Sequence, residues 1–589
     1  MNQTFTMKKL KSLLFAVLLC APLTAIAQDI EIKAENFPDE NFRNWLLEQS
    51  YGKDGILTEE EIKRVIEIVV PERNISSLKG IEYFTALTKL NCYGNQLTLL
   101  DVSQNSVLKE LNCSRNLLTS LNVSHNLVLT ELYCFENQLT SLNVSGCTAL
   151  TFLNCGNNQL SVLNVSECSA LTYLSCDENQ LTSLDVSHNL ALTYLGCIFN
   201  NLSSLDVSHN LSLTVLYCSF NQLTTLDVSQ NIALTELACD ENQLTSLDVS
   251  KNKALTRLFC SDNQLLSLDM SQNTALTELV CYGNQLSSLD VSQNTALRML
   301  NCHTNQLTSL DISNNTALTE VYCGYNQLGL LDVSQNIDLK TLYCNNNQLT
   351  SLDVSQNLAL ISLEFGYNLL TSLDVSKNIA LTELTCYNNQ LSTLDVSNNT
   401  ALTGLQCSCN QLTSLDVSHN PDMYYLYCDG NQLKTLDVSQ NTALSYLDCG
   451  FNQLTSLDVS KNPALTTLFC CTNQIKGEAM DALISTLPQN TSTDVYGLYV
   501  YDSIALGEGN VCTQKQVATA KDKGWTSYYR NAEWEWIVYE GCDDAAGIAL
   551  PELETENGNA PVYNLSGQKV TSPVKGGIYV VDGKKVVVK

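Results

Sequence analysis

Hydrophobic residues recur at fixed positions of a 21-residue unit through most of this chain. The unit begins at Leu87 and reads L-T-x-L-x-C-x-x-N-Q-L-T-S-L-D-V-S-x-N-x-A, and nineteen copies follow one another, the last from Leu465. Apolar and polar residues alternate from Leu90 to Cys92, as in a strand with one buried side. A unit of this length, repeated so often, predicts a solenoid in which each turn contacts mainly its neighbours. The interior of the first turn is expected to hold Leu87, Leu90, Cys92, Leu97, Leu100 and Val102.

Cysteine and asparagine each dominate one position of the unit. Eighteen of the 25 cysteines lie on the 21-residue grid from Cys92 to Cys470, and Phe365 fills the single gap. A free cysteine behaves as a small hydrophobe that is readily buried. Asn95 has an equivalent in all nineteen turns, as far as Asn473. Because a carboxamide both donates and accepts hydrogen bonds, this column predicts a structural ladder that satisfies buried backbone groups.

Aspartate heads a third column, which begins at Asp101. It holds fifteen aspartates, with asparagine instead at Asn122, Asn143 and Asn164. One interpretation is a stack of cation sites. The other is a turn in which the side chain accepts a hydrogen bond from a nearby backbone N–H. Neutral asparagine in three consecutive turns favours the hydrogen-bonded turn.

The motif L-x-x-L-x-C-x-x-N-x-L resembles a leucine-rich repeat with cysteine at an inward leucine position. The repeat length, the cysteine ladder and the D-V-S-x-N tail are most similar to internalin-J-type surface proteins and to secreted leucine-rich repeat proteins of Bacteroidetes. The resemblance implies an α/β-type solenoid dominated by β structure. It would be a curved right-handed solenoid of about nineteen turns, with the parallel sheet on its concave face. The resemblance also implies a role in adhesion.

The regions outside the repeats are expected to be targeting and capping segments. The full division is residues 1–27, a signal peptide; 28–86, a helical N-terminal cap with an atypical first repeat; 87–475, the repeats; 476–544, a small α+β C-terminal cap; 545–561, a linker; and 562–589, a β-hairpin tail. The basic start, the apolar stretch and Ala25-Ile26-Ala27 indicate secretion. The tail resembles sorting or surface-attachment tails of Bacteroidetes proteins, and Asp582-Gly583 predicts its hairpin turn.

Helix signals are clear in both caps. Thr58-Glu59-Glu60-Glu61 is a capping box that predicts a helix start, and an earlier helix should run through Trp45 and Leu46. In the C-terminal cap we expect helices near 479–487 and 513–523, with strands at 497–501, 525–529 and 534–539. Asp54 to Glu61 also resembles the back half of an EF-hand calcium loop. Since its first ligand positions would be Ser50 and Gly52, we favour a cap loop over a calcium site.

Most of the cysteines are expected to be free thiols, because bridging neighbours of a packed ladder would distort the stack. Off the grid, Cys147 and Cys168 both replace the second asparagine of the unit and are candidates for a disulfide between adjacent turns. Cys512 and Cys542 are candidates for a second disulfide that closes the C-terminal cap.

Aromatic residues concentrate at four variable positions on and just after each strand. Stacked strands would merge them into patches on the concave face, where exposed aromatic clusters usually mark interaction sites. The alternative is the preference of aromatic residues for exposed strands. The candidate ligand-binding residues are Tyr133, Phe135, Phe152, Tyr173, Tyr194, Phe199, Tyr217, Phe220, Tyr322, Tyr325, Tyr343, Tyr367, Tyr387, Tyr425, Tyr427 and Tyr446.

Charge and chemistry narrow the class of function. The formal net charge is −30, which argues against nucleic acid as a partner. We do not expect an enzyme, a cofactor or a metal, because four of the five histidines share one loop column and no Walker or HExxH motif occurs. We expect a monomer without a transmembrane segment that is secreted or lies on the bacterial cell surface. It would be an adhesin-like protein that binds a host or environmental protein, glycoprotein or glycan. The alternative is a structural spacer or matrix protein without a specific ligand.

Overall fold

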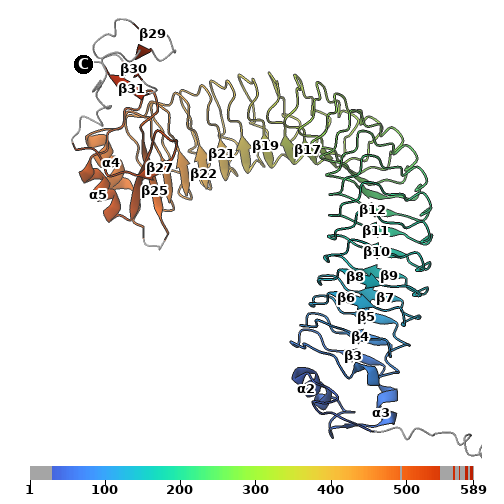
Figure 1. The fold of residues 1–589 in the computed structure, drawn as a ribbon. Coiled ribbons are helices and arrows are strands. Elements are labelled where there is room, and N and C mark those ends of the chain that lie inside the picture. The colour runs from blue at the N-terminus through green and yellow to red at the C-terminus, as the bar shows by residue number, and fades with distance from the viewer. Residues whose placement is uncertain are drawn as a thin grey trace, which may run out of the picture. The chain divides into compact units, whose positions relative to one another are not determined.

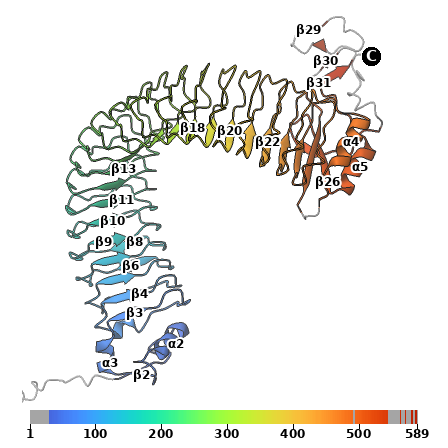
Figure 2. The same ribbon diagram turned by 180° about the vertical axis from the view of Figure 1, so that it is seen from behind.

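The protein is described by a computed structural model over residues 29–490 and 494–543, together with the backbone of four short strands near the C-terminus. The signal peptide expected at residues 1–27 lies outside the described part. The chain divides into two compact units, Met1–Leu244 and Thr245–Lys589. Each unit is a stack of similar turns, with its strands side by side along one edge (Figures 1 and 2). Among the described residues, no helix is both long enough and apolar enough to cross a membrane.

The first unit opens with a small cap. Strand β1 (Ile30–Glu31) pairs antiparallel with β2 (Ile56–Leu57), and helices α2 (Glu40–Glu48) and α3 (Glu59–Arg64) accompany them. Asp39 caps α2 by accepting the backbone N–H of Phe42 at 2.9 Å. The predicted capping box of α3 is confirmed, because Thr58 and Glu61 each bind the other's backbone N–H. A short 3₁₀ helix, η1 (Ile81–Tyr83), leads into the repeats.

The strands of the first unit form one parallel sheet. Equivalent residues face each other across it, as Leu174 faces Leu195, so successive turns are in register. The strands are β3 (Glu67–Val69), β4 (Lys89–Asn91), β5 (Glu110–Asn112), β7 (Glu131–Tyr133), β9 (Phe152–Asn154), β10 (Tyr173–Ser175), β11 (Tyr194–Gly196), β12 (Val215–Tyr217) and β13 (Glu236–Ala238). On another side of the turns, β6 (Ser120–Asn122) pairs with β8 (Ser141–Asn143).

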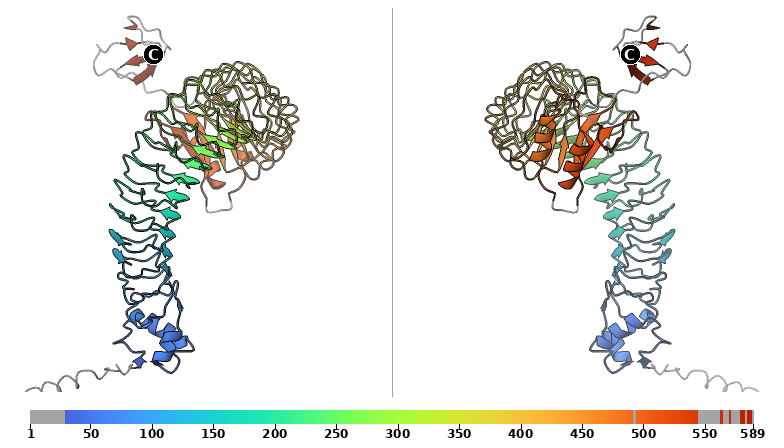
Figure 3. Two further views of the ribbon diagram at one scale, coloured as in Figure 1. Left: turned by 90° about the vertical axis from the view of Figure 1, so that its right-hand side faces the viewer. Right: turned by 90° about the vertical axis from the view of Figure 1, so that its left-hand side faces the viewer.

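The second unit continues the same pattern with eleven more repeat strands. They are β14 (Arg257–Phe259), β15 (Glu278–Val280), β16 (Met299–Asn301), β17 (Glu320–Tyr322), β18 (Thr341–Tyr343), β19 (Ser362–Glu364), β20 (Glu383–Thr385), β21 (Gly404–Gln406), β22 (Tyr425–Tyr427), β23 (Tyr446–Asp448) and β24 (Thr467–Phe469). Figure 3 shows the stacked turns of the first unit, with their strand arrows side by side. The two units together therefore contain the expected nineteen turns.

The C-terminal cap has the helices and strands expected from its sequence. They are α4 (Glu478–Thr486), β25 (Tyr496–Asp502), α5 (Gln514–Asp522), β26 (Trp525–Arg530) and β27 (Trp536–Val538). Strands β25 and β26 extend the parallel sheet beyond β24, and β27 turns back antiparallel. In the tail, β28 (Val562–Tyr563), β29 (Lys569–Val570), β30 (Ile578–Val581) and β31 (Lys584–Val587) form a sheet. Val581 pairs with Lys584 across the predicted hairpin.

The asparagine ladder is confirmed as a structural device. In the first full turn, the Oδ1 of Asn95 accepts the backbone N–H of Ile75 at 2.9 Å. Its Nδ2 donates to the carbonyl oxygens of Val70 at 2.7 Å and Cys92 at 3.0 Å. One side chain therefore joins its own turn to the preceding turn and satisfies backbone groups that no strand partner reaches.

The second asparagine of each repeat forms another buried ladder. Asn126 is fully buried, and its Nδ2 donates to the carbonyls of Val102 and Asn105 at 3.0 and 2.9 Å. Cys147 and Cys168 occupy this column in the next two turns, and the Cys147 thiol lies 3.4 Å from the Val123 carbonyl. Sequence analysis placed these two cysteines in a loop without recognising that their column is buried.

The aspartate column forms hydrogen-bonded turns, as predicted. Asp101 accepts the backbone N–H of Ser103 at 2.9 Å, and Asn122 accepts the equivalent N–H of Ser124 at 3.1 Å. These bonds lower the pKa of Asp101 below its usual value. Among the described residues, no three His, Cys, Asp or Glu side chains are arranged to hold a metal ion.

The ladder cysteines line the interior as thiols. Cys176 is fully buried, and its Sγ lies 3.4 Å from the carbonyl oxygen of Gly196 in the next turn. Burial raises the pKa of the Cys113 thiol to about 12. All 24 described cysteines are present as thiols, including the four disulfide candidates, and Cys409 alone among them is exposed. Cys512 and Cys542 are neighbours through a 3.1 Å backbone hydrogen bond, and both disulfides stay predictions.

Removing one ladder carboxamide should destabilise the protein strongly. Asn305 donates to Cys281 and Cys302 at 3.0 and 3.2 Å and accepts the Leu286 N–H at 3.0 Å. We expect Asn305→Ala to lower the free energy of unfolding by about 2–4 kcal/mol, because buried backbone partners lose their bonds. Gln306→Ala changes the exposed neighbour and should stay within about 0.5 kcal/mol. Equal denaturant midpoints for the two variants would contradict this role.

Thiol counting tests the cysteine assignments. In folded residues 29–589 we expect one thiol, Cys409, to react rapidly with a maleimide, because the other described thiols are buried. Several fast thiols would show that the ladder is accessible. In denaturant without reductant, 24 reactive thiols would mean that neither predicted disulfide forms, and a deficit of four would mean that both do.

Candidate binding face

Each turn has four variable positions on and just after its strand, which together we call the strand face. They are the first and third residues of the strand and the two residues that follow the position of the ladder cysteine. In the turn of β10 these are Tyr173, Ser175, Asp177 and Glu178, while Leu174 between the first two is fully buried. The sixteen candidate ligand-binding residues all occupy strand-face positions.

In the first unit, aromatic side chains stack into a row along the strand face. Phe152 and Tyr173 have ring centroids 4.3 Å apart, and Tyr173 and Tyr194 have centroids 4.2 Å apart, with planes within 7° of parallel. Tyr133 extends the row at 4.6 Å from Phe152, and Tyr217 meets Tyr194 edge-on. Both ring faces of Tyr173 are therefore covered by its neighbours. The row presents ring edges and hydroxyl groups rather than open ring faces.

The residue before each ladder asparagine has a left-handed backbone. In all nineteen turns its φ is positive, with sixteen non-glycine residues and the glycines Gly94, Gly283 and Gly430. The column even holds Thr304 and Thr472 at φ of 52° and 53°. The cause is local, because the ladder carboxamide binds carbonyls two and three residues earlier, as Asn200 binds Ile198 and Cys197. A left-handed backbone costs an ordinary residue roughly 1–2 kcal/mol.

Five aromatic residues occupy this left-handed column and remain well exposed. Tyr325 is 55% exposed, and Phe199 and Tyr367 are each 50% exposed. The full set is Phe199, Phe220, Tyr325, Tyr367 and Phe451. The column lies outside the strands, so the preference of aromatic residues for strands does not explain them. Phe199 and Phe220 stack at 4.1 Å and form a second aromatic cluster beside the row.

In the second unit several aromatic pairs are edge-to-face. Tyr322 meets Tyr343 at 90°, and Tyr367 meets Tyr387 at 81°, each pair with centroids 5.2 Å apart. A further row runs along β22 to β24 through the side chains of Tyr425, Tyr427, Tyr446 and Phe469.

That last row continues into the C-terminal cap, which sequence analysis did not foresee. Phe469 stacks on Tyr499 at 3.8 Å, and Tyr499 stacks on Tyr528 at 4.8 Å. The indole of Trp536 packs edge-on against Tyr499. The available signal was the alternation of tyrosines in β25, because a strand that continues the sheet also continues the row.

Acidic residues hold several phenol groups in place. Tyr133 donates to Glu131 at 3.0 Å, and Tyr322 donates to Glu320 at 3.0 Å. Burial and these carboxylates raise the pKa of both phenols to about 12. These hydrogen bonds show that acidic residues of the strand face orient tyrosine side chains.

Glycines on the strand face make room for long tyrosine contacts. The hydroxyl of Tyr425 donates to Glu383 two turns away, across Gly404. A Cβ at Gly404 would collide with both side chains. Likewise, the ring of Tyr387 lies over Gly366, where a Cβ would be 2.7 Å from the ring. These glycines act through the absence of a side chain rather than through backbone freedom.

A hollow of about 380 Å³ opens on this part of the strand face. It is lined by Glu364, Tyr367, Thr385, Tyr387, Asn388, Gln406, Ser408, Cys409, Tyr427 and Asp429. Three of these residues, Tyr367, Tyr387 and Tyr427, are among the candidate ligand-binding residues. The hollow therefore gathers residues from four successive turns.

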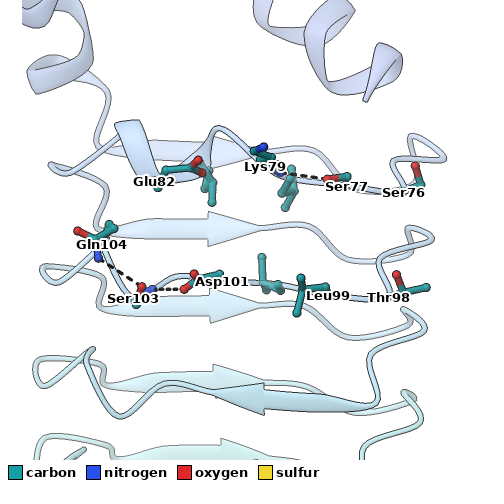
Figure 4. Close-up of a pocket in the computed structure, with 12 residues that line it drawn as sticks. Ser76, Ser77, Lys79, Glu82, Thr98, Leu99, Asp101, Ser103 and Gln104 are labelled. Atoms are coloured by element: carbon teal, nitrogen blue, oxygen red, sulfur yellow. Dashed lines mark hydrogen bonds between the residues drawn. The ribbon is translucent and has the colours of Figure 1, made fainter. Parts of the chain in front are cut away.

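A larger hollow, of about 570 Å³, lies at the aspartate turns of the first unit (Figure 4). Its lining includes Leu100, Asp101 and Ser103, and Asp101 is bonded to Ser103 across the turn. A second hollow at Leu436, Asp437 and Ser439 is lined by the equivalent residues of later turns. Such hollows therefore belong to the common geometry of the repeat, whereas the strand-face hollow depends on variable residues.

Two half-buried carboxyl groups lie at the strand-face hollow: Asp429 lines it, and Asp448 pairs with the hollow residue Tyr427 across the sheet. Burial, and then the charge of Asp429, raise the pKa of Asp448 to about 8. Asp448 accepts the backbone N–H of Gly450 at 3.0 Å, and Ser408 donates to Asp429. Burial also raises the pKa of Asp429. On the same face, His303 stacks on Tyr282 with centroids 4.5 Å apart, and burial lowers its pKa.

Asp448 should make the stability of the protein fall as pH rises. Its pKa is about 8 in the folded protein and about 3.9 when unfolded. The folded form therefore keeps a proton that the unfolded form releases between these values, with a slope of at most about 1.4 kcal/mol per pH unit. We expect Asp448→Asn to flatten the fall in melting temperature over this window. Asp437→Asn, where the pKa is lowered, should leave it unchanged. Parallel curves for Asp448→Asn and wild type would contradict the assignment.

Comparison with known proteins gives a consistent fold. No family model and no curated protein matches this chain. The functional domain of InlJ from Listeria monocytogenes, which includes a cysteine ladder, is similar at 26% sequence identity. The match covers 96% of this chain and 99% of that chain, with a TM-score of 0.43. The plant peptide hormone receptor RGFR1 in complex with RGF2 matches at 18% identity, 80% and 88% coverage and a TM-score of 0.58. PEPR1-AtPEP1 matches at 18% identity, 80% and 76% coverage and a TM-score of 0.60. Together with the in-register turns and the asparagine ladder, the matches to RGFR1 and PEPR1 show that the chain has a leucine-rich repeat fold, built from about nineteen 21-residue turns around a ladder of cysteines.

Proposed function

We propose that this protein is a binding protein that recognises a protein or glycoprotein through its strand face. One observation carries the proposal: large aromatic residues occupy the left-handed column and stay exposed there. Phe199, Tyr325 and Tyr367 are each at least half exposed at φ values near 50°. Glycine or asparagine would fit this backbone better, and the chain uses both elsewhere in the column. Residues held against backbone preference and against burial indicate selection for contact with a partner.

The aromatic row of the first unit favours a polypeptide surface over a neutral sugar. A sugar ring stacks on an open aromatic face, but the faces of Tyr173 are covered on both sides. The exposed edges and hydroxyls suit hydrogen bonding and packing against protein side chains. Tyrosine is also enriched among the residues that dominate protein–protein affinity. The proposal includes secretion or display on the cell surface, on the strength of the expected signal peptide.

The alternative is a rigid spacer or matrix protein, and the repeated hydrogen-bond ladders would suit that role. A spacer needs solenoid length but no exposed aromatic residues at left-handed positions. The two proposals therefore differ in whether a saturable partner exists.

The first test is saturable binding of residues 29–589 to arrayed matrix proteins, mucins and glycans at physiological salt. We expect at least one specific protein or glycoprotein hit. A folded protein that binds nothing on the array in saturable fashion would support the spacer instead.

A double substitution locates the site without disturbing the fold. Phe199→Asn with Phe220→Asn places in the left-handed column a residue that it already holds at Asn157, Asn346 and Asn388. We expect an unchanged or higher melting temperature, because asparagine tolerates this backbone, and a loss of affinity of about 2 kcal/mol or more. The companion variant Tyr173→Ser, Tyr194→Ser and Tyr217→Ser removes the neighbouring row and should also lose binding.

An aromatic residue outside the strand face supplies the control for these variants. Tyr424 is 59% exposed but precedes its strand, so Tyr424→Ser should bind like wild type. Full affinity in both the Phe199/Phe220 variant and the triple tyrosine variant would exclude the strand face of the first unit as the binding site.

A further inference from the structure

Basic residues on the strand face are ion-paired wherever they occur in the repeats. Lys89 pairs with Glu110 at 3.1 Å, Arg115 with Glu136 at 2.8 Å, and Arg257 with Glu278 at 3.0 Å. In each pair the acid lies in the following turn. These are all the lysines and arginines at strand-face positions of the nineteen repeats. Acidic residues in these turns are thus partly neutralised by the chain itself.

The eight turns from Glu320 to Thr472 are different. Their strand face holds five acidic residues and no lysine, arginine or histidine. The acidic residues are Glu320, Glu364, Glu383, Asp429 and Asp448. Glu320 and Glu383 accept hydrogen bonds from tyrosine hydroxyls, those of Tyr322 and Tyr425. This part of the strand face therefore contains no basic side chain that could pair with Glu364 or Asp429.

The strand-face hollow gathers two of these carboxylates among aromatic rings. Glu364 and Asp429 both line it, and none of its ten lining residues is basic. Burial raises the pKa of both carboxyl groups, so a neighbouring positive charge would stabilise their ionised form. Such carboxylates gain strongly from a cation that enters with its own hydrogen bonds.

The tyrosines of the hollow are also suited to binding a cationic group. Tyr367 meets Tyr387 edge-to-face, and Tyr367 is 50% exposed. Tyr427 adds a third ring to the lining. An ammonium or guanidinium group is attracted to an aromatic ring face, and more strongly where water is excluded. Carboxylates and aromatic rings together therefore favour a cation over a neutral or anionic group.

We propose that this hollow receives a lysine or arginine side chain from a basic segment of the protein partner. The proposal rests on the proposed function and specifies the partner: it carries a positively charged, extended segment that lies along the strand face of turns 320–472. The adjacent tyrosines would pack against the aliphatic part of the inserted side chain. The glycines Gly366 and Gly404 serve the site by leaving room for the side chains of Tyr387 and Tyr425.

Cys409 provides a direct reporter of occupancy, because it lines the hollow and is the exposed thiol among the described cysteines. The probes are fluorescein-labelled peptides that alternate glycine with arginine, lysine or glutamate, at physiological salt. We expect the arginine and lysine peptides to bind and to slow maleimide alkylation of Cys409 by about tenfold. The glutamate peptide should do neither. Comparison of the arginine and lysine peptides identifies the preferred cation.

A matched pair of variants tests whether peptide binding depends on the hollow or only on the net charge of the protein. Glu364→Gln with Asp429→Asn removes two charges in the hollow, and Asp437→Asn with Asp458→Asn removes two charges at aspartate turns. The turn variant should keep its fold, since asparagine makes the same bond at Asn122. We expect the hollow variant to lose about tenfold or more in peptide affinity and the turn variant to stay within about twofold.

Three results would overturn the proposal. They are equal losses in both variants, basic peptides that do not bind, and basic peptides that bind while Cys409 reacts at its free rate. The partner found on the array distinguishes this proposal from the proposed function. If that partner is lost in the Phe199/Phe220 variant but retained in the Glu364/Asp429 variant, the binding function stands and the cation site fails.

Discussion

The asparagine ladder is the interaction on which the rest of this structure depends. In each turn one buried carboxamide bonds to its own turn and to the turn before it, as Asn116 does with Cys113 and Cys92 at 3.1 and 3.0 Å. These bonds close the loop after every strand and hold successive turns in register. Hydrophobic burial of leucine, valine and cysteine supplies the driving force, but it does not fix the loop. The ladder does, and in doing so it forces the preceding residue into a left-handed backbone.

This constraint also determines the geometry of the strand face. Because the left-handed residue lies in the loop after the strand, the strand face of each turn has two positions on the strand and two positions in this loop. Aromatic residues on the strand stack into rows with covered faces, whereas those of the left-handed column remain exposed, as Phe199 and Tyr325 do. Loop residues on the other side of the turn, such as Asp101 and Ser103, repeat with little variation. Variation concentrates at the four positions of the strand face.

Much of the fold follows from the sequence because the repeat is strict. Hydrogen-bonding capacity alone predicted the ladder role of Asn95, and the neutral residues at Asn122 to Asn164 predicted the bonded turn of Asp101. The left-handed column was missed, although glycine at Gly94, Gly283 and Gly430 and asparagine at Asn346 and Asn388 were signals for it. The buried role of the second asparagine column was missed because loops usually lie on the surface.

The candidate site was less predictable than the fold. Position in the repeat placed all sixteen candidate residues on the strand face, but ring orientation depends on neighbours in adjacent turns. The Tyr425–Glu383 bond exists because Gly404 between them has no side chain, a relation that spans two repeats. The hollow likewise joins residues from turns 364 to 429. Such features arise from combinations of small and large residues, which a position-by-position reading of the repeat does not reveal.

Hydroxyl-radical footprinting of side chains tests the central claim most directly, because aromatic side chains are reactive and report their own exposure. The protein would be oxidised alone and with the partner retained from the array. The account predicts reduced oxidation in the complex at aromatic residues of the left-handed column, Phe199, Phe220, Tyr325, Tyr367 and Phe451, with Tyr424 unchanged. Protection confined to Tyr424 or to the aspartate turns, with the left-handed column as reactive as in the free protein, would contradict it.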